Sequence, residues 1–401
     1  MKAGWQTKTL GEVCAFLNRG ISPKYLEKGG VCVLNQKCVR DHQISYEPSR
    51  RHDSFAKKVT EERFIQLGDV LVNSTGTGTL GRVAQVRVEP PESTTVDSHV
   101  TIVRPNPGKF FPDFFGYMLI TIEEAIKEAG EGCGGQTELA RSVLAEQFSV
   151  SYPTSIAEQL RIVVILDAAF DGIATAKANA EKNLQNARAL FESHLQSVFT
   201  QRGEGWVDTV IGECIRFIDY RGKTPQKTEG GLRLITAKNV KMGYVQDEPR
   251  EFVAPDSYDG WMTRGIPKLG DVLFTTEAPL ANVAQLETDE KVVFAQRIII
   301  MQPDASQLDS TFLKYLLLSQ PVQQRIHAKG TGATVQGIKA SLLKTIDISF
   351  PKLVAEQRQL VAKLDTLREE TQRLESLYQR KLTALDELKK SLLHQAFSGM
   401  L

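Results

Sequence analysis

Several large classes of protein are excluded by what the sequence lacks. No apolar run approaches the roughly 18 residues that span a bilayer, and residues 1–10 lack the hydrophobic core of a signal peptide. The five cysteines are odd in number, scattered and without a C-x-x-C pair, which is atypical of a disulfide framework or a structural zinc site. We therefore expect a cytoplasmic protein with reduced cysteines, no membrane association and no bound metal.

An excess of charge of one sign is also missing. The chain carries 49 Lys and Arg against 48 Asp and Glu, a formal net charge of +1, so bulk positive charge does not draw it to nucleic acid. This balance is still compatible with a local basic face. A length of 401 residues with 41% hydrophobic and 24% charged residues indicates a folded protein of two to four domains.

The sequence motifs of the enzyme classes we tested are missing as well. A DNA adenine methyltransferase needs an Asn/Asp-Pro-Pro-Tyr/Phe motif to hold the extruded base, whereas Asn106-Pro107 is followed by Gly108. Residues 75–78 (TGTG) lack the third glycine of a dinucleotide-binding loop. The carboxylates Asp256 and Asp289 are too widely separated to indicate a metal nuclease. We expect no catalytic residue and no metal ligand in this chain.

The sequence contains one unit written twice. Three segments match in the same order at offsets near 200: residues 5–16 (WQTKTLGEVCAF) with 206–217 (WVDTVIGECIRF), 67–71 (LGDVL) with 269–273 (LGDVL), and 157–159 (AEQ) with 355–357 (AEQ). A chance match does not keep its order over nearly two hundred residues. The chain is therefore a tandem duplication.

Each copy consists of two parts. The first part has short β-rich runs punctuated by Gly and Pro together with one helical stretch, 113–129 in copy one and 310–329 in copy two. This pattern predicts an α+β class with two tandem α/β domains. The second part is one long helix. The predicted bounds are 1–153 and 205–351 for the domains, and 154–204 and 352–401 for the helices.

A heptad pattern follows both long helices. Copy two keeps a 4-3 spacing through Leu360, Leu364, Leu367, Thr371, Leu374, Tyr378, Lys381, Leu385, Leu388 and Leu392, and copy one repeats it from Ile162 to His194 with many alanines. The unequal seams favour pairing within one chain, as an antiparallel coiled coil that separates the domains about a pseudo-two-fold axis. A homodimeric coiled coil between chains is the alternative. The polar seam residues Asn183, His194 and Lys381 either set the register or lie at its edge.

The tandem arrangement resembles the specificity (S) subunit of type I restriction-modification enzymes over essentially the whole chain. The resemblance rests on LGDVL in both copies, on Gly-rich turns with a Gln at 132–136 (GCGGQ) and 330–336 (GTGATVQ), and on the segments 153–159 and 351–357, which run from a proline to Glu-Gln. It implies two target-recognition domains, each reading half of a bipartite, asymmetric sequence in double-stranded DNA. It also implies a non-catalytic subunit without a cofactor of its own.

The same resemblance implies partners. Its long helices are expected to dock two modification subunits, which methylate adenine N6 with S-adenosylmethionine, and a restriction subunit is an optional further partner. The Ala-, Asn- and Gln-rich outer face of residues 174–189 predicts contact with another subunit. Two other functions compete with this one: a tandem scaffold protein without DNA readout, and an enzyme that acts alone.

Polar loop residues are the candidates for DNA contact, because they offer base-edge donors or phosphate-binding charge. In copy one they are Arg19, Ser22, Lys24, Asn35, Lys37, Arg40, Arg50, Arg51, Ser74, Thr75, Thr77 and Arg82, and in copy two Arg221, Lys223, Lys238, Asn239, Lys241, Thr275, Thr276 and Lys329. Charge supports this only mildly, since residues 1–109 hold 16 basic against 11 acidic residues and residues 205–302 hold 12 against 14. For each candidate the alternative is an ordinary solvated loop residue.

Overall fold

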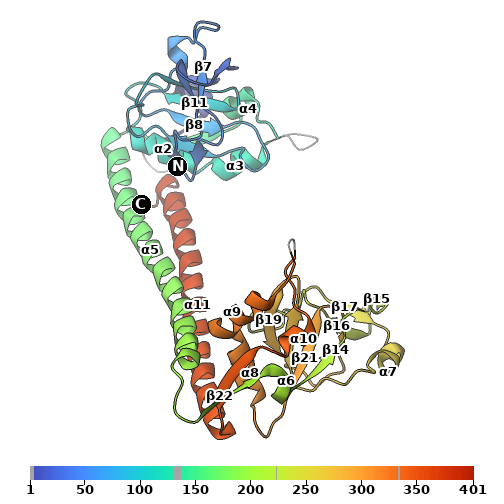
Figure 1. Cartoon of the computed structure of the whole chain (residues 1–401). Coiled ribbons are helices and arrows are strands. Elements are labelled where there is room, and N and C mark those ends of the chain that lie inside the picture. The colour runs from blue at the N-terminus through green and yellow to red at the C-terminus, as the bar shows by residue number, and fades with distance from the viewer. Residues whose placement is uncertain (1–3, 131–136, 223, 333–334) are drawn as a thin grey trace. The chain divides into compact units, whose positions relative to one another are not determined.

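The computed structural model describes residues 4–130, 137–222, 224–332 and 335–401, which fold into two compact units (Figure 1). Unit 1 comprises Met1–Ala180 and Lys381–Leu401, and unit 2 comprises Glu181–Arg380. Each unit therefore contains one mixed domain and the adjoining stretches of both long helices.

Unit 1 is built on two four-stranded sheets. One sheet has the order β2 (Cys14–Arg19), β11 (Val100–Pro105), β8 (Val70–Asn73) and β9 (Val83–Gln85), all antiparallel. The other has the order β10 (Thr94–Val96), β4 (Val31–Leu34), β7 (Arg50–His52) and β3 (Tyr25–Leu26), with β10 and β4 parallel. Two separate strand pairs complete unit 1: β1 (Trp5–Thr9) with β12 (Ser149–Pro153), and β5 (Val39–Arg40) with β6 (Gln43–Ile44).

Unit 2 repeats this plan. Its sheets have the orders β14 (Ile215–Asp219), β21 (Ile298–Pro303), β18 (Val272–Thr276), β19 (Leu280–Gln285), and β15 (Lys227–Thr228), β17 (Glu251–Val253), β16 (Leu232–Ile235), β20 (Val293–Phe294). β13 (Trp206–Val210) pairs with β22 (Asp347–Pro351) as β1 pairs with β12. The duplication seen in the sequence is thus a duplication of fold.

Short helices cover these sheets. In unit 1 they are α1 (Leu10–Val13), α2 (Pro112–Ile120), α3 (Glu123–Glu128) and α4 (Arg141–Glu146), with a 3₁₀ turn η1 (Glu61–Arg63). In unit 2 they are α6 (Ile211–Cys214), α7 (Tyr258–Trp261), α8 (Ser310–Leu318), α9 (Gln320–Lys329) and α10 (Ala340–Leu343), with η2 (Pro255–Ser257). Each predicted helical stretch is therefore two helices.

The central strands separate two hydrophobic cores in each unit. Val70 and Val72 of β8 belong to the core shared with α2 and the long helices, whereas Leu71 belongs to the core between the two sheets. In β18 of unit 2, Phe274 belongs to the core shared with α8 and the long helices, whereas Leu273 belongs to the core between the two sheets. Successive strand residues point to opposite faces, so a strand that is apolar at every position is covered on both sides. LGDVL is such a strand with its preceding turn.

The aspartate of LGDVL shapes that turn in both units. An Oδ2 atom of Asp69 accepts a hydrogen bond from the backbone N–H of Gln66 at 2.9 Å, and Asp271 accepts one from Lys268 at 2.8 Å. Across the sheet, Arg104 donates to Asp69 from Nε at 2.8 Å. The motif that identifies the repeat is therefore part of the scaffold.

Each long helix is attached to its domain by a buried glutamine and a tyrosine–aspartate pair. In α5 (Ile156–Thr200), the Oε1 atom of Gln159 accepts a hydrogen bond from the backbone N–H of Phe111 at 2.8 Å. Tyr117 in addition donates a hydrogen bond to Asp167. In α11 (Val354–Phe397) the same two roles fall to Gln357 and to Asp365, the acceptor for Tyr315.

The two long helices run antiparallel within each unit. In unit 1, Nζ of Lys177 lies 2.7 Å from Oδ1 of Asp386, and in unit 2, Nε of Arg188 lies 2.9 Å from Oε2 of Glu375. The step from 177 to 188 along α5 matches the step from 386 back to 375 along α11, so both ion pairs fit one antiparallel register. The predicted pairing within one chain is confirmed.

The predicted seam of α5 holds as far as Ala187 and is wrong beyond it. Ile162, Leu166, Ile173, Ala180 and Ala187 are buried as expected, but the next buried residues of α5 are Leu195 and Phe199 instead of the predicted Leu190 and His194. A straight helix has 3.6 residues per turn and drifts by about 20° per heptad relative to a strict 3.5 repeat. The polar residues Asn183, His194 and Lys381 are exposed, so they lie at the edge of the seam and not inside it.

Candidate nucleic-acid interface

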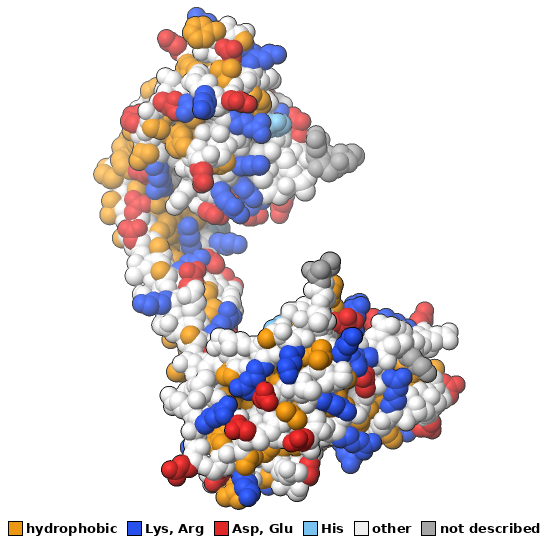
Figure 2. All heavy atoms as spheres, viewed as in Figure 1, with side chains coloured by type: hydrophobic (Ala, Val, Ile, Leu, Met, Phe, Trp, Pro, Cys, Tyr) orange, Lys and Arg blue, Asp and Glu red, His pale blue; other side chains and the backbone are white. Residues whose placement is uncertain are grey.

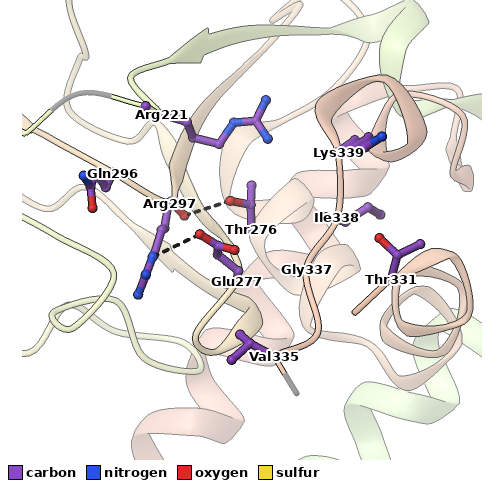
Figure 3. Close-up of a pocket in the computed structure, with 11 residues that line it drawn as sticks. Arg221, Thr276, Glu277, Gln296, Arg297, Thr331, Val335, Gly337, Ile338 and Lys339 are labelled. Carbon is purple, nitrogen blue, oxygen red and sulfur yellow. Dashed lines mark hydrogen bonds and ion pairs between the residues drawn. The ribbon is translucent and has the colours of Figure 1, made fainter. Parts of the chain in front are cut away.

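Loops at one end of the central sheet of unit 2 surround a cavity of about 480 Å³ (Figure 3). The residue just before β21, Arg297, lies close to Glu277, which follows β18. Arg221 and Lys339 line the same cavity from the loop after β14 and from the N-terminal side of α10. The cavity is polar, and most of its charge is positive.

Arg297 and Glu277 form an ion pair in this cavity. Nε of Arg297 lies 3.0 Å from Oε1 of Glu277, and the two side chains are 47% and 45% exposed. Arg297 has a φ of 72°, in the left-handed region that residues other than glycine rarely adopt. Such conformations cluster at binding sites. The pair presents a donor and an acceptor side by side to solvent.

Arg221 is held in place by Asp219. Its Nε and Nη2 atoms donate to the two carboxylate oxygens of Asp219 at 2.8 and 2.6 Å. Burial acts to raise the pKa of Asp219, but the hydrogen bonds from Arg221, with the charges of Arg221 and Arg264, outweigh it and hold the pKa below its usual value. The guanidinium therefore faces the cavity as an oriented cation.

The equivalent loops of unit 1 carry different side chains. Oγ1 of Thr75 lies 2.7 Å from Nδ1 of His99, which is exposed. Arg19 donates from Nη1 to Glu138 at 2.5 Å and from Nη2 to the carbonyl oxygen of Leu139 at 2.6 Å. Both units thus place polar side chains at the same sheet end, but the chemistry differs.

The Arg-Gly pairs at residues 19–20 and 221–222 align in the sequence, and yet Arg19 and Arg221 are not structural counterparts. In unit 1, Thr101 of β11 pairs with Arg19, whereas in unit 2, Ile299 of β21 pairs with Asp219. A register shift in β2 next to Pro105, which adds one residue to this strand, accounts for one of the two residues of this difference. Sequence alignment alone cannot show such a bulge.

Metal chemistry and membrane insertion find no support in the described part of the chain. Among these residues, no group of three or more His, Cys, Asp or Glu side chains could hold a metal ion. The same residues include no helix with the length and apolarity to cross a membrane.

Comparison with known families decides the class of protein. The family model of the type I restriction modification DNA specificity domain matches residues 2–185 and 264–383, which is most of the chain. The chain belongs to this family. It is the DNA sequence-recognition subunit of a type I restriction-modification system. Members of this family supply recognition rather than catalysis. The mixed domains of units 1 and 2 are target-recognition domains 1 and 2.

Solved structures share the fold of this specificity subunit. A chain from a study of complex assembly and conformational transition of a type I restriction-modification system is 19% identical, with a TM-score of 0.79, and the match covers 99% of this chain and 98% of that one. The HsdS subunit from Thermoanaerobacter tengcongensis is also 19% identical, with a TM-score of 0.62 and coverage of 100% and 98%. Among curated proteins the sequence finds no match.

Many of the predicted DNA-contact residues lie on the surface. Ser22, Lys24, Lys37, Arg40, Arg50, Thr77 and Lys238 are exposed. Lys238 lines a cavity of about 210 Å³ that shares Gln296 and Arg297 with the larger one. Arg50 lies over the ring of Tyr25, with its Cζ atom 4.7 Å from the ring centre. These residues remain candidates.

A second group is half-buried and bonded to the protein itself. It comprises Arg19, Asn35, Arg51, Thr75, Arg82, Arg221 and Lys329, while Lys241 is half-buried and bonds to Tyr244 through its backbone. Arg51 pairs with Glu92 at 2.6 Å, and Lys329 donates to the carbonyl oxygen of Thr345 at 2.8 Å. Contact with DNA at these positions requires an exchange of partners.

Four predicted residues need correction, because their side chains are buried in the domains: Ser74, Asn239, Thr275 and Thr276. Oγ of Ser74 hydrogen-bonds to Oγ1 of Thr101 at 2.5 Å. Asn239 accepts a hydrogen bond from the backbone N–H of Thr236 at 3.1 Å and donates to the carbonyl oxygen of Pro249 at 3.0 Å. Buried polar groups satisfy themselves in this way, so these side chains stabilise the loops rather than face DNA.

Parts of the predicted site lie outside the described residues. They are Lys223, the first Gly-rich turn at 132–136, and residues 333–334 of the second turn. The flanking residues Thr331 and Gly337 line the larger cavity.

Sequence reasoning missed Glu277, Arg297 and Lys339 in unit 2 and His99 and Glu138 in unit 1. The available signal was position: His99 and Arg297 each come directly before the buried central strand of their domain. The residue before such a strand lies at the end of the sheet, where loops meet.

Charge is interspersed over the subunit. Figure 2 shows Lys and Arg side chains next to Asp and Glu side chains across the visible face of each unit. Many basic residues are paired, as Arg104 is with Asp69. This pattern agrees with the balanced composition and favours local readout over a broad basic field.

Proposed function

We propose that this specificity subunit reads a bipartite, asymmetric target in double-stranded DNA, with one half-site for each target-recognition domain. One observation carries the proposal: two copies of one scaffold present different side chains from the same loops. Domain 1 presents Thr75 with His99, and domain 2 presents Glu277 with Arg297. Sequence is read by hydrogen bonds to base edges, so unlike side chains on like scaffolds suit unlike half-sites.

The long helices have a second role in the proposal: they separate the half-sites and dock two modification subunits. Near its N-terminal end, α5 exposes an apolar stripe of Ile156, Leu160 and Val164, and Figure 2 shows hydrophobic side chains gathered there. Contiguous exposed apolar surface is typical of subunit interfaces.

Chemistry belongs to the partners in this proposal. The modification subunits would bind S-adenosylmethionine and methylate adenine, and a restriction subunit is an optional further partner. The chain itself would act in the cytoplasm, where the DNA substrate lies.

The test is to map methylated adenines after co-expression with the cognate modification subunits. We expect one bipartite motif with a fixed gap, and loss of methylation when this chain is omitted. Methylation that does not depend on this chain, or that lacks a fixed-gap motif, would contradict the proposal and favour the scaffold alternative.

A further inference from the structure

Backbone hydrogen bonds align the two domains without reference to side chains. The N–H of Ser74 donates to the carbonyl oxygen of His99 at 2.8 Å, and the N–H of Thr276 donates to that of Arg297 at the same distance. Ser74 is therefore equivalent to Thr276, and His99 to Arg297.

The residue that follows in each domain is aligned by an isolated β-bridge. Thr75 forms an antiparallel bridge with Glu138, and Glu277 forms one with Gly337. Thr75 and Glu277 are thus equivalent, each following the buried residue aligned above.

These two aligned positions bond to each other in both domains, but through different groups. In domain 1 a hydroxyl meets an imidazole, Thr75 with His99, at 2.7 Å. In domain 2 a carboxylate meets a guanidinium, Glu277 with Arg297, at 3.0 Å. The attachments of the long helices, in contrast, use the same residue types in both copies. Geometry is kept at this pair while chemistry changes.

We infer that these two positions determine the half-site specificity of each domain, and that Glu277 and Arg297 together read a G·C base pair. The inference rests on the proposed function. Guanine offers the acceptors O6 and N7 in the major groove, which suit the guanidinium fork of Arg297, and cytosine offers the N4 donor, which suits a carboxylate. A donor fork beside an acceptor therefore complements the edge of one G·C pair.

The pair is free to exchange partners. Both side chains are about half exposed, and an exposed ion pair contributes little to stability. Guanine and cytosine edges can therefore replace the contact between Arg297 and Glu277 at low cost. Arg221 and Lys339, which line the same cavity, supply positive charge for the flanking phosphates.

The experiment transplants the chemistry of domain 1 into domain 2. The double variant E277T/R297H is assembled with the modification subunits and its methylated motif is mapped. We expect the half-site of domain 2 to lose a G·C requirement, with binding discrimination at that base pair falling by about 10- to 100-fold, while the half-site of domain 1 is unchanged. The reciprocal variant T75E/H99R is expected to change only the half-site of domain 1.

Two controls isolate the pair. D247T/R250H removes another exposed ion pair of unit 2, between Asp247 and Arg250, and should leave the motif intact. R297K keeps the charge but loses the planar fork, so it should bind DNA and discriminate poorly, even where the double variant fails to fold.

An unchanged motif in E277T/R297H and in R297K would overturn the inference and leave the proposed function standing. If the wild-type complex itself gave no fixed-gap motif, the proposed function would fail first. The two failures are therefore distinguishable.

Discussion

Gln357 lies fully buried at the start of α11, and its Oε1 atom accepts a hydrogen bond from the backbone N–H of Asp309 at 2.8 Å. Its Nε2 atom donates to the carbonyl oxygens of Pro351 and Gln307, both at 2.8 Å. One side chain thus joins the long helix to two loops of domain 2. Asp309 in turn caps α8, accepting from the N–H groups of Thr311 and Phe312 at 3.0 Å.

Substitution Gln357→Leu is expected to destabilise unit 2 by about 2–4 kcal/mol, because buried backbone groups lose their partners, each at a cost of about 1–3 kcal/mol. Urea denaturation measures the change. Gln359→Leu, at an exposed position two residues on, is the matched control and should stay near wild type. Equal stabilities of the two variants would show that Gln357 is not needed for attachment.

Gln159 in unit 1 makes equivalent contacts, with the N–H of Phe111 and the carbonyl oxygen of Pro153. Contacts that recur in both copies belong to the part of the fold that the sequence could predict. Gln159, Gln357, Asp69 and Asp271 recur because the scaffold needs them, and a duplicated scaffold shows itself as a repeat. The repeat therefore predicts two mixed domains, two long helices and their pairing. It carries no information on readout, because readout is where the copies differ.

The candidate site was less predictable for a physical reason. A polar residue in a loop looks the same in sequence whether its side chain faces solvent or satisfies a buried backbone group. Thr275 illustrates this: it is buried, accepts a hydrogen bond from the N–H of Asn282 at 2.9 Å, and contacts the carbonyl oxygen of Pro279. Arg297 was not predicted because it directly precedes the strongly apolar strand β21. In the sequence, such a residue looks like the ordinary polar position at which a buried strand begins.

The tyrosine–aspartate contact predicts a pH effect at high pH. Burial, followed by the hydrogen bond to Asp167, raises the pKa of Tyr117 to about 12. The folded state therefore keeps this proton when the unfolded chain, with a tyrosine pKa near 10, has lost it. Stability from this group is fully present below about pH 10 and is lost as the pH rises toward 12.

Comparison of wild type with Tyr117→Phe separates this effect from other titrations. We expect the free energy of unfolding of the variant to fall less steeply between pH 10 and 12. Because Asp167 is only half-buried, water can solvate it after the substitution, so the loss at pH 7 should be about 0.5–1.5 kcal/mol. Parallel pH profiles would argue against the shifted tyrosine.

The apolar stripe of α5 predicts where assembly depends on this chain. Val164 is 59% exposed, so Val164→Asp should change folding stability by less than about 0.5 kcal/mol. Association with the modification subunits should weaken strongly, because a buried unpaired carboxylate is costly at an interface. Size-exclusion chromatography of the mixed subunits measures this, with the nearly isosteric Val164→Thr as a mild control. Wild-type assembly of V164D would place the interface elsewhere.

A final prediction concerns the distance between half-sites. Insertion of seven residues into α5 after Lys182, matched by seven in α11 after Arg380, keeps the two helices paired, since the antiparallel register places these points opposite each other. Seven residues add about 10.5 Å of helix, close to the rise of three base pairs. Three further base pairs also turn the second half-site by about 100° around the DNA axis. Because part of that rotation must be absorbed by untwisting DNA, we expect a gap longer by one to three base pairs with weaker binding. Methylome mapping reads the gap directly, and an unchanged gap in a folded, methylating variant would mean that the helices do not set the spacing.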